Sequence, residues 1–395
     1  MRNIIVLIGI ILVGILPVRA QLFDDDQFRA QAQTGLDQMY NCSFESAGRT
    51  FYNLLEEHPE HPAPYFLLAL NRWWQTYISV TMPDYYGYID DKLNKAEDRL
   101  DLIKNKPGYD REYIFFKFMI HALEARAHSF QNEWWSAMGA AKKLVDPLEK
   151  SLYYVGQDPE FYMVAGLYHY YVETYHQQIP AIRPVLSFFP DGDIQKGLQE
   201  LRTAAGTFNM AQIEAQYFLG TIYAHEIDQP ANALEVTGRL HRRYTQNTWF
   251  QNDYANALIV AGRPDEARPI IENLIATYQS QHGHQTRNIN SKESLHTTYL
   301  MVRVFHNLGR IHMESGGDYD AALNAFEQSN LMATLSKVEA DYYLPANQYY
   351  MGLCYDYMGM REQAIAAYEE VLELDENTAY ESQARSHISS PPTGN

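Results

Sequence analysis

Cysteine and positive charge are both scarce in this sequence. Only Cys42 and Cys354 occur in 395 residues, and neither belongs to a metal-binding or redox motif. Lys and Arg number 31 against 49 Asp and Glu, so the formal net charge is −18. Because a phosphate backbone is bound by a basic surface, we expect no nucleic-acid partner. The two cysteines lie near opposite ends of the chain. If the chain folds as an open array of helical hairpins, they stay apart as free thiols.

Catalytic motifs are absent as well. The sequence has no Gly-x-Ser-x-Gly elbow, P-loop, Gly-x-Gly-x-x-Gly loop or His-Glu-x-x-His pair. Two Glu-x-x-His pairs occur, Glu173–His176 and Glu293–His296. A di-iron site needs two such pairs in one helix-bundle core, whereas a linear array of hairpins would hold these two about three hairpins apart. We therefore expect no enzyme activity, no metal and no cofactor, and a metal-dependent enzyme is the remotest alternative.

Long hydrophobic runs are missing except at the N-terminus. Ile4 to Leu16 is apolar, follows Arg2, and is shorter than the roughly 20 residues of a bilayer span. Val18 and Ala20 fit a secretory cleavage site. We predict that residues 1–20 are a signal peptide cleaved after Ala20. The mature chain is then periplasmic or secreted, without stable membrane insertion.

The sequence lacks the pattern of β-strands and instead carries a repeated spacing that predicts pairs of helices. No segment alternates apolar and polar residues over the length of a strand. Near the C-terminus, Gly352 and Ala364 are small residues that let two antiparallel helices approach, and Gly359 separates those helices. The same spacing recurs along the chain. Its small packing residues are Gly35, Ala47, Gly220, Ala233, Ala267, Gly309, Ala322, Gly352 and Ala364.

These spacings resemble the tetratricopeptide repeat (TPR) of bacterial exported proteins, a helix–turn–helix unit of about 34 residues. The resemblance implies an all-α, right-handed superhelical solenoid of about eight TPR-like hairpins over residues 21–388. A capping helix is expected near 380–387, and residues 389–395 are expected to be a disordered tail. Stacked hairpins leave a long concave surface, and the resemblance implies that this surface binds a protein or peptide partner.

Residues 165–201 depart from the regular repeat. A Pro-broken apolar insertion, residues 179–190, precedes Gly192, Asp193 and Gly197. This segment resembles the eukaryotic tetratricopeptide family of mitochondrial outer-membrane and inclusion-body proteins. Asp193 is expected to cap a helix N-terminus. The apolar insertion either folds back onto the array or forms a binding lip.

The sequence contains 31 Tyr and 5 Trp residues, and many of these aromatic residues fall at positions that are expected to line the groove. Counting from the small residue of each unit gives Trp73, Trp74, Tyr170, Tyr171, Tyr217, His225, Arg310, Tyr349 and Tyr357 as binding candidates. Phe66, Leu70, Met163, Leu167, His306 and Leu353 fall at further positions of this kind. Packing between neighbouring helices is the other role open to each of them.

Two binding functions follow from such a groove. The first is an exported, non-enzymatic scaffold for protein–protein interaction, which predicts charged and amide groups among the groove aromatics. The alternative is a small-molecule or glycan-binding solenoid, which predicts paired rings such as Trp73 and Trp74 exposed over a shallow trough. The sequence does not identify the partner.

Overall fold

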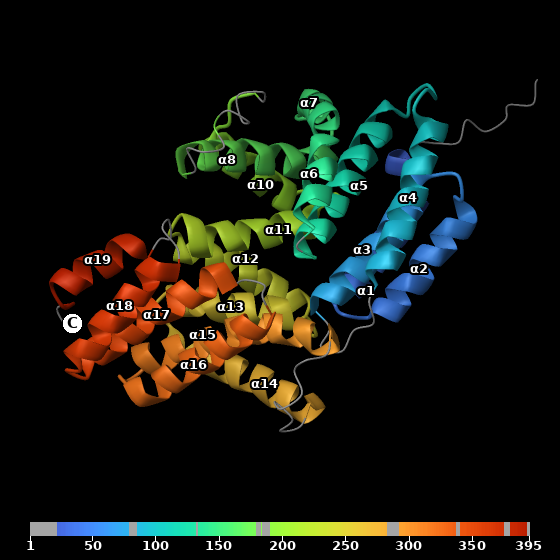
Figure 1. Ribbon diagram of the computed structural model, residues 1–395. Coiled ribbons are helices and arrows are strands. Elements are labelled where there is room, and N and C mark those ends of the chain that lie inside the picture. Colours follow the sequence, from blue (N-terminus) through green and yellow to red (C-terminus); the bar gives the residue numbers. More distant parts are fainter. Residues whose placement is uncertain are drawn as a thin grey trace, which may run out of the picture.

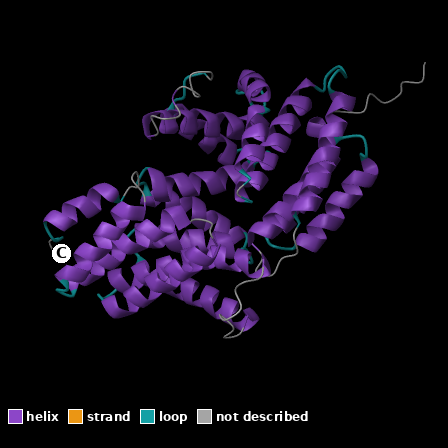
Figure 2. Ribbon diagram, in the orientation of Figure 1, coloured by secondary structure: helices purple, strands orange, loops and turns teal. Residues whose placement is uncertain are grey.

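The computed structural model describes residues 22–78, 85–131, 133–178, 183, 190–282, 292–336, 340–374 and 380–392. Within these residues the secondary structure consists of 18 α-helices and three short 3-10 or π segments, with no strand (Figures 1 and 2). The all-α solenoid predicted from the sequence is confirmed. The predicted signal peptide and nearly all of the apolar insertion 179–190 lie outside the described residues.

The helices form eight successive hairpins and one final helix. The first four hairpins are α1 (Asp26–Tyr40) with α2 (Phe44–Glu57), α3 (Pro62–Ile78) with α4 (Tyr86–Ile103), α5 (Asp110–Phe130) with α6 (Trp134–Lys142) and α7 (Val145–Tyr154), and α8 (Tyr162–Gln178) with α10 (Ile194–Gly206). The other four are α11 (Gln212–Thr221) with α12 (Pro230–Arg243), α13 (Thr248–Val260) with α14 (Pro264–His282), α15 (Lys292–Glu314) with α16 (Tyr319–Ser336), and α17 (Ala340–Tyr357) with α18 (Arg361–Leu374). Helix α19 (Glu381–Ser389) follows α18 and packs against it.

Two local features differ from the regular pattern. The second helix of the third hairpin is split into α6 and α7. Pro147 lies in the first turn of α7, lacks the amide hydrogen that a continuous helix needs, and would clash with the carbonyl of Lys143. In addition, α11 ends in a π-helical turn, η4 (Ile222–Glu226), after which Asp228 has a positive φ of 46°. This turn changes the direction in which the side chains of residues 222–226 point.

The predicted small residues lie where the two helices of a hairpin cross. In three hairpins a glycine of the first helix faces an aromatic ring of the second, and a Cβ there would approach the ring too closely. These pairs are Gly35 with Phe51 at 2.3 Å, Gly309 with Phe326 at 2.5 Å, and Gly352 with Tyr368 at 2.4 Å. The alanines of the pattern, Ala47, Ala233, Ala267, Ala322 and Ala364, are all 0% exposed. Close contact between helices therefore depends on the absence of larger side chains at these positions.

In the middle hairpin the two helices are close enough for backbone atoms to meet. A Cβ on Gly197 of α10 would lie 2.5 Å from the backbone nitrogen of Tyr170, and one on Gly166 of α8 would lie 2.9 Å from the carbonyl oxygen of Gly197. The carboxylate of Asp193 accepts a hydrogen bond from the amide of Lys196 at 2.9 Å and caps α10. The motif around Gly192 is thus a helix start at a tight crossing.

The solenoid is not open. Its first hairpin contacts the segment that joins α12 to α13, about two hundred residues further along the chain. Arg243 pairs with Asp37 at 2.9 Å, the Tyr244 hydroxyl donates to the same carboxylate at 2.6 Å, and Asn247 Nδ2 donates to the carbonyl of Tyr40 at 2.9 Å. One hydrophobic core therefore joins residues of the first hairpins to residues as far along the chain as Tyr343, and a second core lies around α8 and α10. The expectation that distant hairpins stay apart is wrong.

Cys42 and Cys354 are both free thiols, and Cys354 is buried. None of the described helices is long and apolar enough to span a bilayer.

Candidate binding pockets on the inner face

The first helices of the hairpins, α1, α3, α5, α8, α11, α13, α15 and α17, form what we call the inner face. Three groove candidates there, Trp73, Trp74 and Tyr217, are only 1%, 0% and 8% exposed. Trp74 lies edge-on to Phe250 with 5.9 Å between ring centroids. The exposed Trp73–Trp74 pair expected for glycan binding is therefore absent. Because the chain closes on itself, these rings fill the interior and their apolar area is removed from water.

Tyr170 and Tyr171 also serve the interior. Tyr170 is 1% exposed, and Tyr171 is half-buried. Their hydroxyls donate to the two carboxylate oxygens of Glu226 in η4, at 2.9 and 3.0 Å. Burial, followed by the nearby Glu226 charge, raises the pKa of both phenols. The expectation that these tyrosines stand free in an open groove is wrong for Tyr170, because its ring packs in the core around α8.

The two C-terminal candidates have different surroundings. Tyr349 is 8% exposed and stacks on the His387 ring of α19 at 5.8 Å. It therefore helps to hold the last helix against the array. Tyr357 is 39% exposed and neighbours Tyr319 at 5.5 Å. Of the five aromatic candidates other than Tyr170 and Tyr171, only Tyr357 is exposed.

His225 and Arg310, by contrast, come together in one pocket. This polar pocket has a volume of about 190 Å³ and is lined by Ala224, His225, Asn256, Val260, His306, Arg310, Tyr342, Tyr343, Tyr350 and Tyr380. The π turn η4 carries His225 into it, α15 supplies His306 and Arg310, and α17 supplies three tyrosines. The helix spacing that placed His225, His306 and Arg310 on a common face thus brings them into contact with one cavity.

Both histidines of the polar pocket are held neutral. Desolvation, then the charge of Arg303 and Arg310, lowers the pKa of His225 to about 3. His225 is nevertheless exposed to water at the wall of the pocket, whereas His306 is buried. Desolvation and the Arg310 charge lower the pKa of His306 to about 3 as well. His306 Nδ1 lies 2.7 Å from Asn347 Oδ1, so Nδ1 carries the proton and Nε2 remains an acceptor.

Arg310 supplies the cation of this pocket. Its Nε and one terminal nitrogen donate to Glu314 at 3.0 and 2.9 Å, which balances its charge. The guanidinium also lies over the Tyr350 ring at 5.4 Å. Tyr342, which is 44% exposed, shares a hydrogen bond with Tyr380. The pocket therefore offers several donors and acceptors without a net charge of its own.

Sequence reasoning did not identify Asn256, Tyr342 or Tyr380 as pocket residues. Asn256 Nδ2 lies 3.2 Å from His225 Nε2, and His225 belongs to the π turn. Because a π turn is rare, the regular helix spacing used to count the candidates did not include it. Tyr380 lies just before the capping helix, outside the repeat spacing from which the other candidates were counted.

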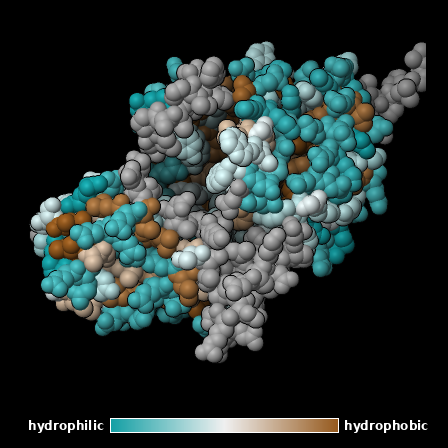
Figure 3. Space-filling model, viewed as in Figure 1, coloured by the Kyte–Doolittle hydropathy of each residue, from teal (hydrophilic) through white to brown (hydrophobic). Residues whose placement is uncertain are grey.

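A second cavity, the apolar pocket, lies between α1, α3, α5, α8 and α11. It has a volume of about 210 Å³, and its lining includes Phe66, Leu70, Met163 and Leu167 from the predicted groove positions. In Figure 3 the surface is hollowed between the places that α6, α8 and α11 occupy in Figure 1. Both pockets are lined almost wholly by first helices, so the inner face carries one apolar and one polar cavity.

Comparisons with known proteins agree with this architecture at the C-terminus. Residues 345–378 match the model of the tetratricopeptide repeat, over the hairpin of α17 and α18. This chain contains a tetratricopeptide repeat. No curated protein matches the sequence. The resemblance of residues 165–201 to the mitochondrial family stays a prediction.

Among solved structures, the chain is similar to the crystal structure of the P58(IPK) TPR domain. The identity is 16%, and the alignment covers 92% of this chain and 96% of that chain, with a TM-score of 0.25. A TM-score of 0.25 lies below the level at which two chains share one arrangement of helices.

Proposed function

We propose that this chain is an exported, non-enzymatic scaffold that binds an extended segment of a partner protein at the polar pocket. The repeat at residues 345–378 belongs to a fold that generally serves protein interaction. The observation that carries the proposal is the mixture of groups in the pocket. Arg310, His306 and Asn256 lie among tyrosines there. Binding of a peptide is expected to need such a mixture of charged, amide and aromatic groups.

A peptide backbone presents one donor and one acceptor at each residue, so it needs both kinds of group from its site. The neutral histidines and the phenols provide acceptors, and the phenols and Arg310 provide donors. Tyrosine adds contact area at low cost in side-chain entropy. The glycan alternative lacks a comparable observation, because Trp73 and Trp74 are buried.

Two exposed tyrosines of α17 give a matched test. Tyr342 is 44% exposed and lines the polar pocket, whereas Tyr357 is 39% exposed and does not. The mature protein is applied to an array of peptides and to an array of glycans. Peptides that bind the wild type are then titrated against Tyr342→Ala and Tyr357→Ala by calorimetry.

We expect Tyr342→Ala to weaken peptide binding by about 2 kcal/mol, as for a central aromatic anchor, and Tyr357→Ala to leave it unchanged. Equal binding by both variants would reject the polar pocket as the site. Binding to glycans alone would reject the scaffold.

Export is tested separately on the protein made in its own cells. Residues 1–20 carry the pattern of a signal peptide. We expect mass analysis of envelope material to find a mature N-terminus at Gln21. Recovery of an intact Met1 terminus in the membrane pellet would contradict export with cleavage.

A further inference from the structure

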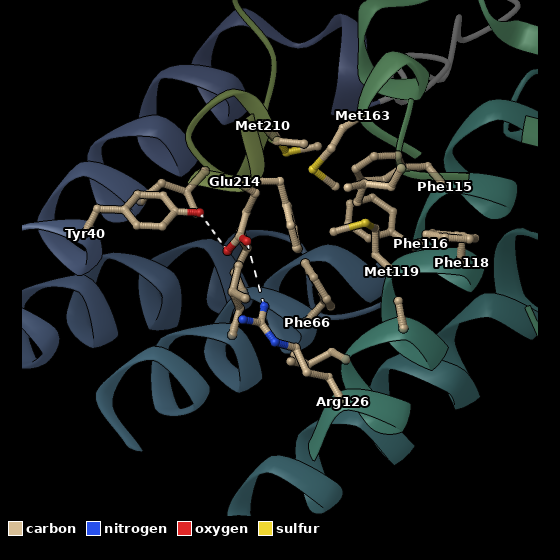
Figure 4. Close-up of a pocket in the computed structure, with 18 residues that line it drawn as sticks. Tyr40, Phe66, Phe115, Phe116, Phe118, Met119, Arg126, Met163, Met210 and Glu214 are labelled. Carbon is tan, nitrogen blue, oxygen red and sulfur yellow. Dashed lines mark hydrogen bonds and ion pairs between the residues drawn. The ribbon is translucent and has the colours of Figure 1, made fainter. Parts of the chain in front are cut away.

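We propose that the apolar pocket binds a small, neutral, largely apolar molecule that carries one hydroxyl or amide group at one end. This ligand is distinct from the peptide of the proposed function, and the inference does not rest on that function. The lining of the pocket, its entrance and the balance of charge at one end point to such a ligand (Figure 4).

The lining is apolar except at one end. Fifteen of its 18 residues have apolar side chains, and the other three are Tyr40, Arg126 and Glu214. A dry apolar cavity of about 150 Å³ is large enough to bind benzene, and this one measures about 210 Å³. Met119, Met163 and Met210 project into it, and methionine side chains adapt to the shape of a ligand.

A small molecule can enter from the side of α5, α8 and α11. Residues on the α1 and α3 side, such as Phe66 and Leu67, are buried and form the floor. Phe118, Leu167 and Phe218 are only half-buried and form the rim. The apolar lining is thus continuous from a partly exposed rim to a closed floor.

Glu214 defines the polar end, and it is only 6% exposed. Its Oε1 accepts hydrogen bonds from Trp74 Nε1 at 2.7 Å and from the Tyr40 hydroxyl at 3.2 Å. Its Oε2 has one neighbour of opposite charge, Arg126 Nη1, at 3.9 Å, which is longer than a hydrogen bond. Oε2 therefore keeps the capacity to accept a hydrogen bond from a ligand.

Arg126 is held by aromatic rings. Its guanidinium lies over Trp73 at 5.2 Å, Tyr77 at 5.5 Å and Phe218 at 5.9 Å. Burial alone would lower the pKa of Arg126, but Glu214 and the surrounding phenols raise it overall. Its only ionic contact among the described residues is the 3.9 Å approach to Glu214, so its N–H groups remain available as donors.

These two side chains select the charge of the ligand. A carboxylate would meet Glu214, and an ammonium group would meet Arg126, so a charged head has an unfavourable neighbour in either case. A hydroxyl or an amide can accept from Arg126 and donate to Glu214 at the same time. The rest of the ligand fills the apolar part of the pocket.

Three probes with the same eight-carbon chain test the charge argument. Octan-1-ol, octanoate and octylammonium are each titrated into the full mature chain, and binding is followed by calorimetry and by tryptophan fluorescence. We expect octan-1-ol to bind at least about tenfold more tightly than either charged probe. Octanoate or octylammonium binding as tightly as the alcohol would overturn the proposal, and so would no binding by any probe.

Two variant pairs locate the site. Ala122 lines the pocket and Ala125 of the same helix does not, so Ala122→Phe should abolish octan-1-ol binding and Ala125→Phe should preserve it. Glu214→Gln keeps an oxygen for Trp74 and Tyr40 but removes the negative charge. It should raise the affinity for octanoate at least about tenfold and weaken that for octan-1-ol, because the amide group that replaces Oε2 cannot accept the hydrogen bond of the alcohol.

Circular dichroism and thermal melting show that each variant is folded before it is titrated. Equal loss of binding in Ala122→Phe and Ala125→Phe would show that the alcohol binds elsewhere. Unchanged discrimination against octanoate in Glu214→Gln would show that Glu214 does not select the ligand. Either result overturns the proposal.

Discussion

The two pockets of the inner face use the same helix positions for opposite chemistry. In the N-terminal half, α3, α5 and α8 present Phe66, Met119 and Met163, and the charged side chains among the described residues that line the pocket are the opposed pair of Arg126 and Glu214. In the C-terminal half, α15 and α17 present histidine, arginine and tyrosine side chains. The helix geometry of the repeat therefore determines where a side chain points, whereas the type of residue at that position determines whether it packs in the core or lines a polar pocket.

The closure of the chain increases this difference. Because α1 packs against the α12–α13 connection, the aromatic residues of the N-terminal half are covered from both sides. Tyr342 in the C-terminal half, by contrast, stays exposed. Four predictions test how stability is distributed between the two halves and the contact that closes the chain.

The largest effect is expected for Trp74→Ala. This substitution deletes a fully buried ring and removes the hydrogen bond that Trp74 Nε1 donates to Glu214. It should cost about 3–5 kcal/mol of unfolding free energy, measured in urea. The control is Trp135→Ala, since Trp135 is 86% exposed and should contribute almost nothing. A loss below about 1 kcal/mol for Trp74→Ala would show that the interior rings are not a core.

The next effect concerns pH and the polar half. The folded pKa of His306 is about 3, below its ordinary value of 6.5, so only the unfolded chain binds a proton between these values. Its contribution to stability is therefore present above pH 6.5 and is lost as the pH falls towards 3. Between pH 7 and pH 4.5 the loss should be about 2–3 kcal/mol.

His306→Gln isolates this contribution from that of the other titratable groups. Gln keeps a donor for Asn347 but does not titrate in this range. Urea unfolding of the two proteins at both pH values should show the smaller loss in the variant. Identical pH dependence would mean that His306 binds its proton equally well in the folded and the unfolded chain.

A third effect should be equal in the two halves. Gly35→Ala and Gly352→Ala each place a methyl group against an aromatic ring, at 2.3 and 2.4 Å. Each should cost about 1–3 kcal/mol by overpacking the crossing. Gly139→Ala in α6 meets nothing within 4 Å and should be neutral or slightly stabilising. Unequal costs for Gly35 and Gly352 would show that the two halves do not share one packing rule.

The smallest effect is expected at the contact that closes the solenoid. Arg243 and Asp37 pair at 2.9 Å, but their side chains are 45% and 39% exposed. Arg243→Gln should therefore change the unfolding free energy by about 0–1 kcal/mol, and less at high salt. A loss above about 2 kcal/mol would mean that this ion pair, and not the buried rings beneath it, holds the closure.

Local sequence determined the repeat, because small residues and helix spacing act over short distances. Gly352, Ala364 and Tyr368 predict a hairpin from residues that lie within one repeat, and that hairpin is where the TPR match falls. The same spacing placed His225, His306 and Arg310 on one face. Such information is local, since helix geometry relates residues three or four positions apart.

Only the tertiary structure decided which of the inward-facing side chains are covered. Trp74 and Tyr342 both lie on first helices, yet Trp74 is buried by Phe250 and Tyr217 from distant hairpins and Tyr342 is exposed. The angle between successive hairpins accumulates along the array, so small differences at each crossing decide whether distant hairpins meet. The split after α6 and the π turn that directs His225 contribute to that path. The contact between α1 and the α12–α13 connection depends on all the crossings between them, which no single motif in the sequence encodes.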